Sequence, residues 1–143
     1  MIKKLIFLTG IILSLITLQA KSGKKTSGNL PLLNTKWILE KIDDSYIFFH
    51  DTDTAYIVFY DNYKFAGNFS CNIFFGEFSY GKKRIKLDYV GATKKLCQDM
   101  DIEERFFKTI KNDITHYYVA KNNLYLLYKL KVVCKFRGIV VSD

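Results

Sequence analysis

The sequence predicts an α+β fold that is mostly β: a curved, open-barrel-like and largely antiparallel sheet of about eight strands with one long α-helix. Short segments rich in Tyr, Phe, Ile, Val and Leu recur along the chain, and their apolar residues have a period close to two. Turn-forming pairs such as Asp61-Asn62 separate these segments. Only the segment around residues 101–111 has helical spacing. Short turns between strands favour antiparallel pairing of sequence neighbours.

The first twenty residues are typical of a secretory signal peptide. A basic start is followed by an apolar run of about fourteen residues up to Leu18, and small Ala20 precedes Lys21. We expect cleavage after Ala20, with an uncleaved membrane anchor as the alternative, although the run is short for a membrane span. The mature chain is then exported, periplasmic or secreted, and not a lipoprotein, because no Cys precedes Cys71.

Two further regions follow the predicted leader. Residues 21–31 are polar, rich in Gly and Ser, and end at the only Pro, which is typical of a flexible linker. Residues 32–138 then form one domain, a size that suits a single hydrophobic core.

The charge of the mature chain is moderately basic. The leader contains two of the 22 basic residues, so 20 basic and 14 acidic residues remain and the net charge is +6. Only three of the basic residues are Arg. Because phosphate and base recognition usually recruits the Arg guanidinium, and because the chain is predicted to be exported, we expect no nucleic-acid partner.

The first strand is expected within residues 32–42, with Trp37 and Leu39 on one face, and residues 55–89 predict a four-stranded meander. Alternation in the last three strands of this meander assigns the following residues to the inner face: Phe65, Gly67, Phe69, Cys71, Phe74, Gly76, Phe78, Tyr80, Ile85, Leu87 and Tyr89.

A helix and three strands complete the domain. Asp101 and Glu104 have the spacing of a capping box, and Ile102, Phe106 and Ile110 form one apolar stripe that ends before Asn112-Asp113. The segments around 114–121, 124–129 and 131–138 then predict three strands. In the last of these, alternation assigns Val132, Cys134 and Phe136 to the inner face.

The three cysteines contain no CxxC pair, so no zinc or thioredoxin-type motif is predicted. Cys134 is expected to be buried, which leaves Cys71 and Cys97 as the candidate disulfide in an oxidising compartment. A packed thiol at Cys71 and a reactive thiol at Cys97 remain the alternatives. The sequence contains no catalytic motif, so we expect no enzyme, no catalytic residue, no cofactor and no metal site.

Adjacent aromatic residues suggest an apolar surface besides the core. Phe74-Phe75 and Tyr117-Tyr118 place aromatic rings on both faces of their strands. One face of each pair is expected to line an apolar groove or a partner surface.

Several motifs occur in a recognisable order: "NTKW" (34–37), "FAGNFSCNIFFGEF" (65–78), "ATKKLC" (92–97) and "EERFFKTI" (103–110). At this spacing the chain resembles the META domain family of HslJ-like small exported bacterial proteins. Asn34 and Ser70 depart from the Gly residues usual in the family. The matching signature residues are Trp37, Gly67, Cys71, Asn72, Phe74, Gly76, Thr93 and Cys97.

The resemblance implies that Gly67, Cys71, Asn72 and Gly76 form a structural strand–turn–strand signature. It also implies an envelope protein linked to stress, motility or drug tolerance, without an agreed enzymatic activity. We therefore expect a monomeric, non-catalytic domain that acts through contacts with an unknown envelope protein. A carrier of a lipid or other small apolar ligand is the alternative, because the family fold resembles a lipid-binding secretion pilotin. Membrane contact is expected only if the leader is uncleaved.

Overall fold

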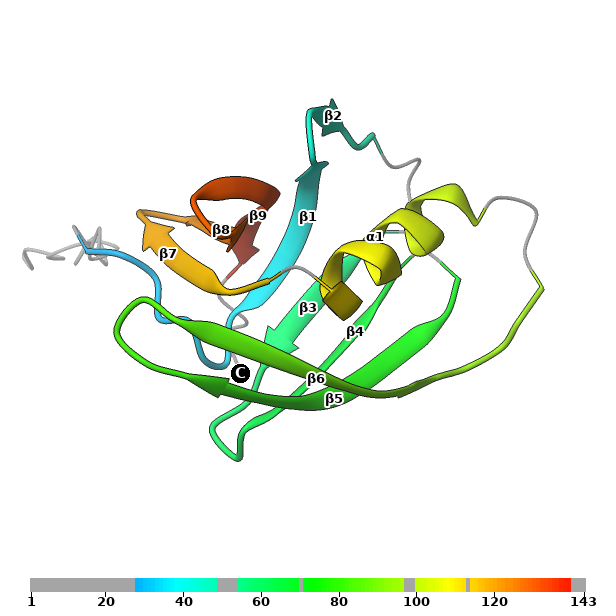
Figure 1. Ribbon diagram of the computed structural model, residues 1–143, viewed down its shortest axis with the longest axis horizontal. Helices are drawn as coiled ribbons and strands as arrows, with labels where there is room; N and C mark the ends of the chain where they lie inside the picture. The colour runs from blue at the N-terminus through cyan, green and yellow to red at the C-terminus, as the bar shows by residue number, and fades with distance from the viewer. Residues whose placement is uncertain (1–27, 49–53, 70, 97–99, 113, 140–143) are drawn as a thin grey trace, which may run out of the picture.

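The computed structural model describes residues 28–48, 54–69, 71–96, 100–112 and 114–139. Within these residues the chain forms one curved antiparallel sheet and one α-helix (Figure 1). The elements are β1 (Lys36–Ile42), β2 (Ser45–Tyr46), β3 (Tyr56–Phe59), β4 (Lys64–Asn68), β5 (Ile73–Tyr80), β6 (Ile85–Ala92), α1 (Asp101–Asn112), β7 (His116–Ala120), β8 (Asn123–Tyr128) and β9 (Lys131–Ile139).

Eight strands lie in the order β6-β5-β4-β3-β1-β9-β8-β7, and the two-residue β2 pairs with β1 alone. The sheet curls until its edge strands, β6 and β7, approach each other in a nearly closed barrel (Figure 1). The predicted fold class and the meander over residues 55–89 are therefore confirmed. In the middle of this order β1 pairs with β9, so strands from the two ends of the domain lie side by side.

The interior of the barrel is filled with side chains. Helix α1 contributes Phe106, whose ring lies 3.5 Å from that of Phe69 and 6.1 Å from that of Phe136, measured between centroids. The largest aromatic side chains with almost no exposed surface are Trp37, Phe59, Phe65, Phe69, Phe74, Phe106 and Phe136. Each such side chain contributes roughly 1.5–3 kcal/mol through burial.

The predicted alternation of buried and exposed residues holds for most positions of the meander and fails at Tyr80 and Leu87. Phe65, Phe74 and Ile85 are buried as predicted, whereas Tyr80, which was assigned to the inner face, is 40% exposed. Leu87 is only partly buried. Tyr80 is the last residue of β5 and lies at the opening between the sheet edges.

Bulges also change the alternation, two of them in β1 and β9. The pairing of β8 with β9 moves from Leu126–Cys134 to Leu127–Val132, so Val133 is an extra residue. Val133 is buried beside Cys134, while Val132, predicted to face inward, is half-buried. The pairing of β1 with β9 skips Glu40 in the same way.

Helix α1 begins one residue earlier than the predicted capping box requires. The carbonyl oxygen of Met100 accepts the first helical hydrogen bond, from the backbone N–H of Glu104, at 2.9 Å. Met100 therefore occupies the cap position and Asp101 is the first helical residue. The acidic first turn remains favourable, because negative charge there opposes the helix dipole.

The domain includes the end of the predicted linker. The backbone N–H of Leu30 donates to the carbonyl oxygen of Lys121 at 2.9 Å, and the side-chain oxygen of Asn29 accepts from the backbone N–H of Lys121 at 2.7 Å. These bonds attach residues 29 and 30 to the turn between β7 and β8. Residues 1–20 and most of 21–31 lie outside the described residues.

Candidate functional site

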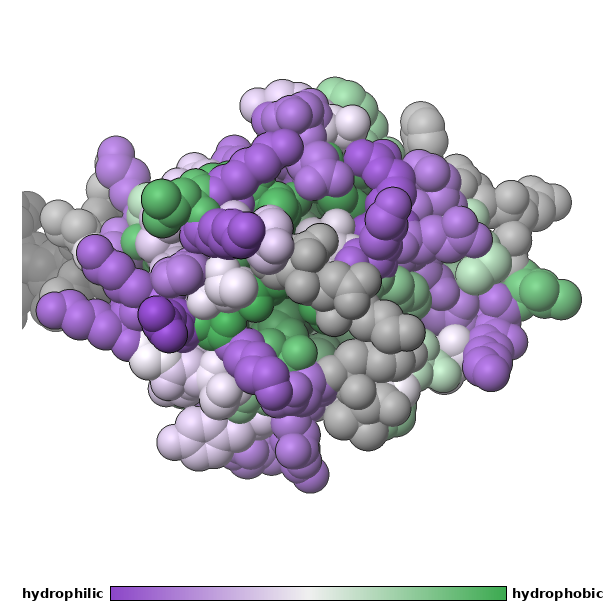
Figure 2. Space-filling view, in the orientation of Figure 1, coloured by the Kyte–Doolittle hydropathy of each residue, from purple (hydrophilic) through white to green (hydrophobic). Residues whose placement is uncertain are grey.

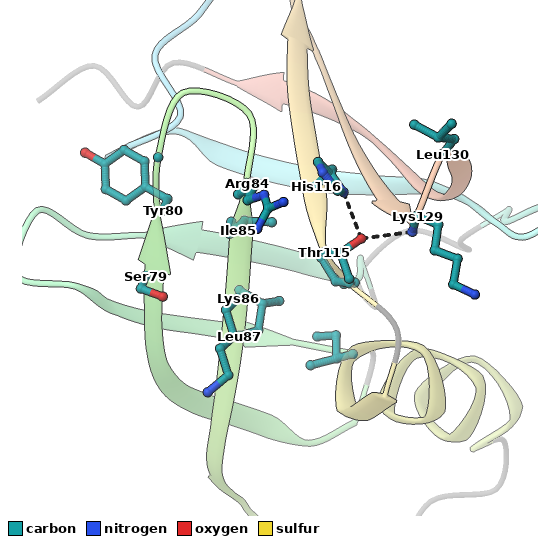
Figure 3. Close-up of a pocket in the computed structure, with 13 residues that line it drawn as sticks. Ser79, Tyr80, Arg84, Ile85, Lys86, Leu87, Thr115, His116, Lys129 and Leu130 are labelled. Carbon is teal, nitrogen blue, oxygen red and sulfur yellow. Dashed lines mark hydrogen bonds between the residues drawn. The ribbon is translucent and has the colours of Figure 1, made fainter.

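A pocket of about 840 Å³ opens where the two edges of the sheet separate. At one end of the gap, β6 and β7 are joined by a bridge between Arg84 and His116. The backbone N–H of Ile85 donates to the carbonyl oxygen of Thr115 at 3.2 Å. That of Tyr117 donates to the carbonyl oxygen of Lys83 at 3.0 Å. Beyond this junction the strands diverge toward α1, and the pocket occupies the space between them (Figure 3).

The floor of the pocket is apolar. Ile85 and Leu87 point toward it from β6, because they alternate with Lys86 along the strand. Ile110 lies in the last turns of α1 and continues the apolar stripe of Phe106. Ile114 lies two residues before β7 and also lines the pocket. Figure 2 shows the result as green side chains between purple ones in the region between β6 and β7.

The rim of the pocket is basic. Arg84, Lys86 and Lys129 line it, and none of its described lining residues is acidic. Lys86 Nζ forms an ion pair with Asp88 Oδ1 at 2.7 Å, and Lys129 Nζ lies 5.2 Å from the centre of the Tyr128 ring. In Figure 3 the side chain of Arg84 is turned toward β7 across the gap, while the Lys86 and Lys129 side chains end away from it.

Hydrogen bonds hold the β7 side of the pocket in place. The Thr115 hydroxyl oxygen lies 2.9 Å from His116 Nδ1 and accepts from the backbone N–H of Lys129 at 2.9 Å (Figure 3). These contacts tie the start of β7 to the turn between β8 and β9. The exposed side chain of Leu130, at the same turn, forms part of the rim.

The residues predicted to line an apolar groove do not lie together. Phe74 is fully buried in the core, and its neighbour Phe75 is 48% exposed on the outer face. Tyr117 is half-buried and donates from its hydroxyl to the carbonyl oxygen of Gly81 at 3.0 Å. Tyr118 lies on the outer face, stacked on Tyr125 with 4.5 Å between ring centroids. None of the four lines the pocket between β6 and β7.

Phe75 does line a second, smaller pocket of about 510 Å³ on the outside of the sheet. Tyr60, Lys64, Ala66 and Glu77 surround it. These residues come from the outer faces of β4 and β5 and from the turn before β4, so this pocket is separate from the one between the sheet edges.

Asn72 is the centre of a buried hydrogen-bond network. Its side-chain nitrogen donates to Glu103 Oε1 at 2.8 Å and to the carbonyl oxygen of Lys95 at 3.3 Å. Its side-chain oxygen accepts from the Thr93 hydroxyl and from the backbone N–H of Lys95, both at 2.8 Å. Every donor and acceptor of the amide is used, so this network connects α1 to the turn before β5 and has a structural role.

The other signature residues are also structural. Trp37 is fully buried and donates from its indole N–H to the carbonyl oxygen of Leu32 at 2.9 Å. A methyl group on Gly67 would overlap the carbonyl oxygen of Tyr56 and the ring of Phe74. A methyl group on Gly76 would overlap the carbonyl oxygen of Asp88 and the ring of Phe65.

The cysteines lie in different surroundings. The predicted burial of Cys134 is confirmed, and burial raises the pKa of its thiol far above the usual value. The Cys71 sulfur lies 3.8 Å from the carbonyl oxygen of Lys95. Cys97 lies outside the described residues, so its pairing with Cys71 stays a prediction.

Among the described residues there is no cluster of three side chains suited to hold a metal ion. The described part of the chain also contains no helix with the length and apolar character needed to span a bilayer.

Sequence reasoning missed the pocket because its residues come from three separate segments, 79–87, 110–116 and 129–130. One signal was present: Ile85 and Leu87 face inward on a strand with no following meander strand to cover its free edge.

Comparison with known proteins agrees with the fold. The sequence profile of the META domain matches residues 30–138. An NMR structure with 18% sequence identity aligns over 74% of this chain and 90% of that chain, with a TM-score of 0.59. An NMR structure of a protein from Burkholderia xenovorans has 16% identity, covers 77% of this chain and 85% of that chain, and has a TM-score of 0.62.

At these identities the two structures are evidence for the fold alone. No curated protein matches the chain. The family profile covers well over half of the sequence, in the region that the sheet and helix occupy. This chain therefore belongs to the META domain family.

Proposed function

We propose that this protein is a non-catalytic, exported META domain of the cell envelope that binds a small apolar ligand between β6 and β7. One observation carries the proposal: a pocket of about 840 Å³ with an apolar floor opens at the only break in the barrel wall formed by the described strands. Pockets that bind small molecules typically measure about 300–1,000 Å³ and have mostly apolar walls.

The packing of the interior supports this location. Phe65, Phe74 and Phe106 fill the space inside the sheet, so an apolar ligand has room at the edge gap rather than at the barrel centre. The non-catalytic part of the proposal rests on the META domain, which is not a known enzyme family, and on the structural use of the Asn72 network.

Binding of a fluorescent apolar probe tests the proposal. The chain without its predicted leader, residues 21–143, should bind the probe saturably at about one molecule per chain. Leu87→Gln places a polar amide in the half-buried floor and should weaken binding. Phe75→Gln makes the same kind of change in the second pocket and should leave binding intact.

Both variants need unchanged thermal unfolding for this comparison. Loss of probe binding in Phe75→Gln but not in Leu87→Gln would move the site to the outer face and contradict the proposal. A flat titration of the folded wild-type protein would remove the carrier function altogether.

Protein contact is the second candidate function. Large apolar side chains at Phe48, Leu96 and Leu130 are 85%, 99% and 90% exposed, which leaves apolar area for a partner surface. Native mass spectrometry of the protein purified from its own envelope separates the candidates. A small added mass supports a bound ligand, and a second polypeptide supports protein contact. A role in stress or drug tolerance rests on the family resemblance alone.

A further inference from the structure

Arg84 is the one arginine of this chain without a carboxylate partner among the described residues. Arg105 pairs with Asp101 at 3.5 Å, and Arg137 pairs with Glu40 at 3.0 Å. Arg84 lines the pocket and has no ion pair or side-chain hydrogen bond to a described residue. A guanidinium presents a fixed fork of N–H donors that matches a carboxylate.

The surroundings of Arg84 favour an anion. Lys86 and Lys129 also line the pocket, and none of its described lining residues carries negative charge. Lys86 is already paired with Asp88 at 2.7 Å. Figure 3 shows Arg84 turned into the gap toward Thr115 and His116, at the end where the two edge strands are bridged.

The apolar floor begins beside this arginine and runs away from it. Ile85 follows Arg84 directly, Leu87 lies two residues further along β6, and Ile110 of α1 lines the same pocket. A strand rises about 3.3 Å per residue, so roughly 10 Å separate positions 84 and 87. A ligand that fills the site therefore needs an anionic group at one end and an extended apolar chain behind it.

We propose that the ligand of this pocket is a long-chain fatty acid, whose carboxylate is bound by Arg84 and whose alkyl chain lies on the floor formed by Ile85, Leu87 and Ile110. This inference rests on the proposed ligand-binding function and adds the chemical class of the ligand and its orientation.

Isothermal titration with matched ligands tests the inference. The ligands are palmitate, hexadecanol and acetate, each below the concentration at which it aggregates, added to residues 21–143. Palmitate should bind roughly 10- to 100-fold more tightly than hexadecanol, the range expected for one charge-assisted contact. Acetate should not bind measurably, because it cannot reach the floor.

Variants of Arg84 distinguish a direct contact with the carboxylate from a general attraction of the basic surface for an anion. Arg84→Gln should abolish the preference for palmitate over hexadecanol without changing hexadecanol affinity, and Arg84→Lys should restore part of it. Lys83→Gln removes a neighbouring charge that does not line the pocket, and it should leave both affinities unchanged.

The possible failures are distinguishable. Equal affinity of palmitate and hexadecanol for the wild-type chain would overturn the fatty-acid inference while apolar binding stands. An equal loss of palmitate affinity in Lys83→Gln and Arg84→Gln would also overturn it. The positive charge of the surface, and not a contact with Arg84, would then attract the carboxylate. No binding of either long-chain ligand, together with a flat probe titration, would overturn the proposed function as well.

Discussion

The Asn72 side-chain nitrogen donates a hydrogen bond of 2.8 Å to the Glu103 carboxylate, and both residues are almost fully buried. Glu103 also accepts from the Asn72 backbone N–H at 3.2 Å. Three donor contacts from Asn72 thus satisfy the buried Glu103 carboxylate, which has no basic partner among the described residues. This arrangement attaches the first turn of α1 to the turn that precedes β5.

Glu103→Gln should therefore destabilise the protein by about 1–3 kcal/mol, because its amide NH₂ would face the Asn72 donors and leave a buried group unsatisfied. Glu104→Gln is the matched control, since Glu104 lies in the same turn but is exposed. Urea unfolding measures both. Equal midpoints for the two variants would show that the Asn72 contact contributes little beyond the shared helix-dipole effect.

Gly67→Ala should also destabilise the domain, by about 1–3 kcal/mol, as expected when atoms are forced into a packed core. The added methyl group would meet the carbonyl oxygen of Tyr56 and the ring of Phe74. The control is Gly81→Ala, where a methyl group would meet no atom within 4 Å. Thermal unfolding of both variants checks this, and a tolerated Gly67→Ala would mean that β3 and β5 can separate without cost.

Cys71 and Cys97 are expected to form a disulfide in the exported protein. Lys95, two residues before Cys97, lies near the Cys71 sulfur, with 3.8 Å to its carbonyl oxygen. The closed loop of about 26 residues would stabilise the fold by roughly 3–3.5 kcal/mol in the chain-entropy model. Thiol counting on denatured, non-reduced protein should find one thiol, mapped to Cys134. Three thiols in protein taken directly from the envelope would rule the bridge out.

Stability should fall in alkaline solution. Burial, and then Tyr80, raises the pKa of Tyr117, and the hydrogen bond that Lys135 donates to the Glu40 carboxylate raises the pKa of Lys135. The unfolded chain releases these protons first, near the ordinary values of 10.0 and 10.5. The stabilisation is therefore complete below about pH 10 and is lost as the pH rises through the folded-state pKa values.

Tyr117→Phe should make this alkaline decline shallower, because one of the titrating groups is removed. The change also removes the hydrogen bond to Gly81, so stability at neutral pH should fall slightly. Tyr60→Phe is the control for loss of a hydroxyl on an exposed ring. Denaturant midpoints measured between pH 8 and pH 11 test the sign, and a decline as steep as wild type would contradict the assignment to Tyr117.

Processing should leave Lys21 as the N-terminus of the exported protein. The basic start, the short apolar run and Ala20 together predict this cleavage. Edman sequencing or intact-mass analysis of protein from the envelope checks it. A chain that retains Met1 would instead indicate an N-terminal anchor.

The sequence by itself determined the features that depend on neighbouring residues. Alternating apolar positions and turn pairs predict β3 to β6 as a meander, and the four-residue spacing of Phe106 and Ile110 predicts α1. The burial of Cys134 is also predicted, because alternation places Cys134 on one face of its strand with apolar Val132 and Phe136. These features are local because a turn pairs a strand with its sequence neighbour, and a strand or helix period assigns side chains to faces.

Only the tertiary structure decided which distant segments meet. It paired β1 with β9, placed Glu103 against Asn72, and shifted Val133 into the core through a bulge. A period of two in the sequence assigns each side chain to a face of its strand. It contains no information on which distant strand pairs with the other edge of that strand, or on where a bulge inserts an extra residue. The pocket at Arg84 depends on that missing information, because it exists only where the curled sheet brings β6 close to β7 and leaves them unpaired beyond Ile85.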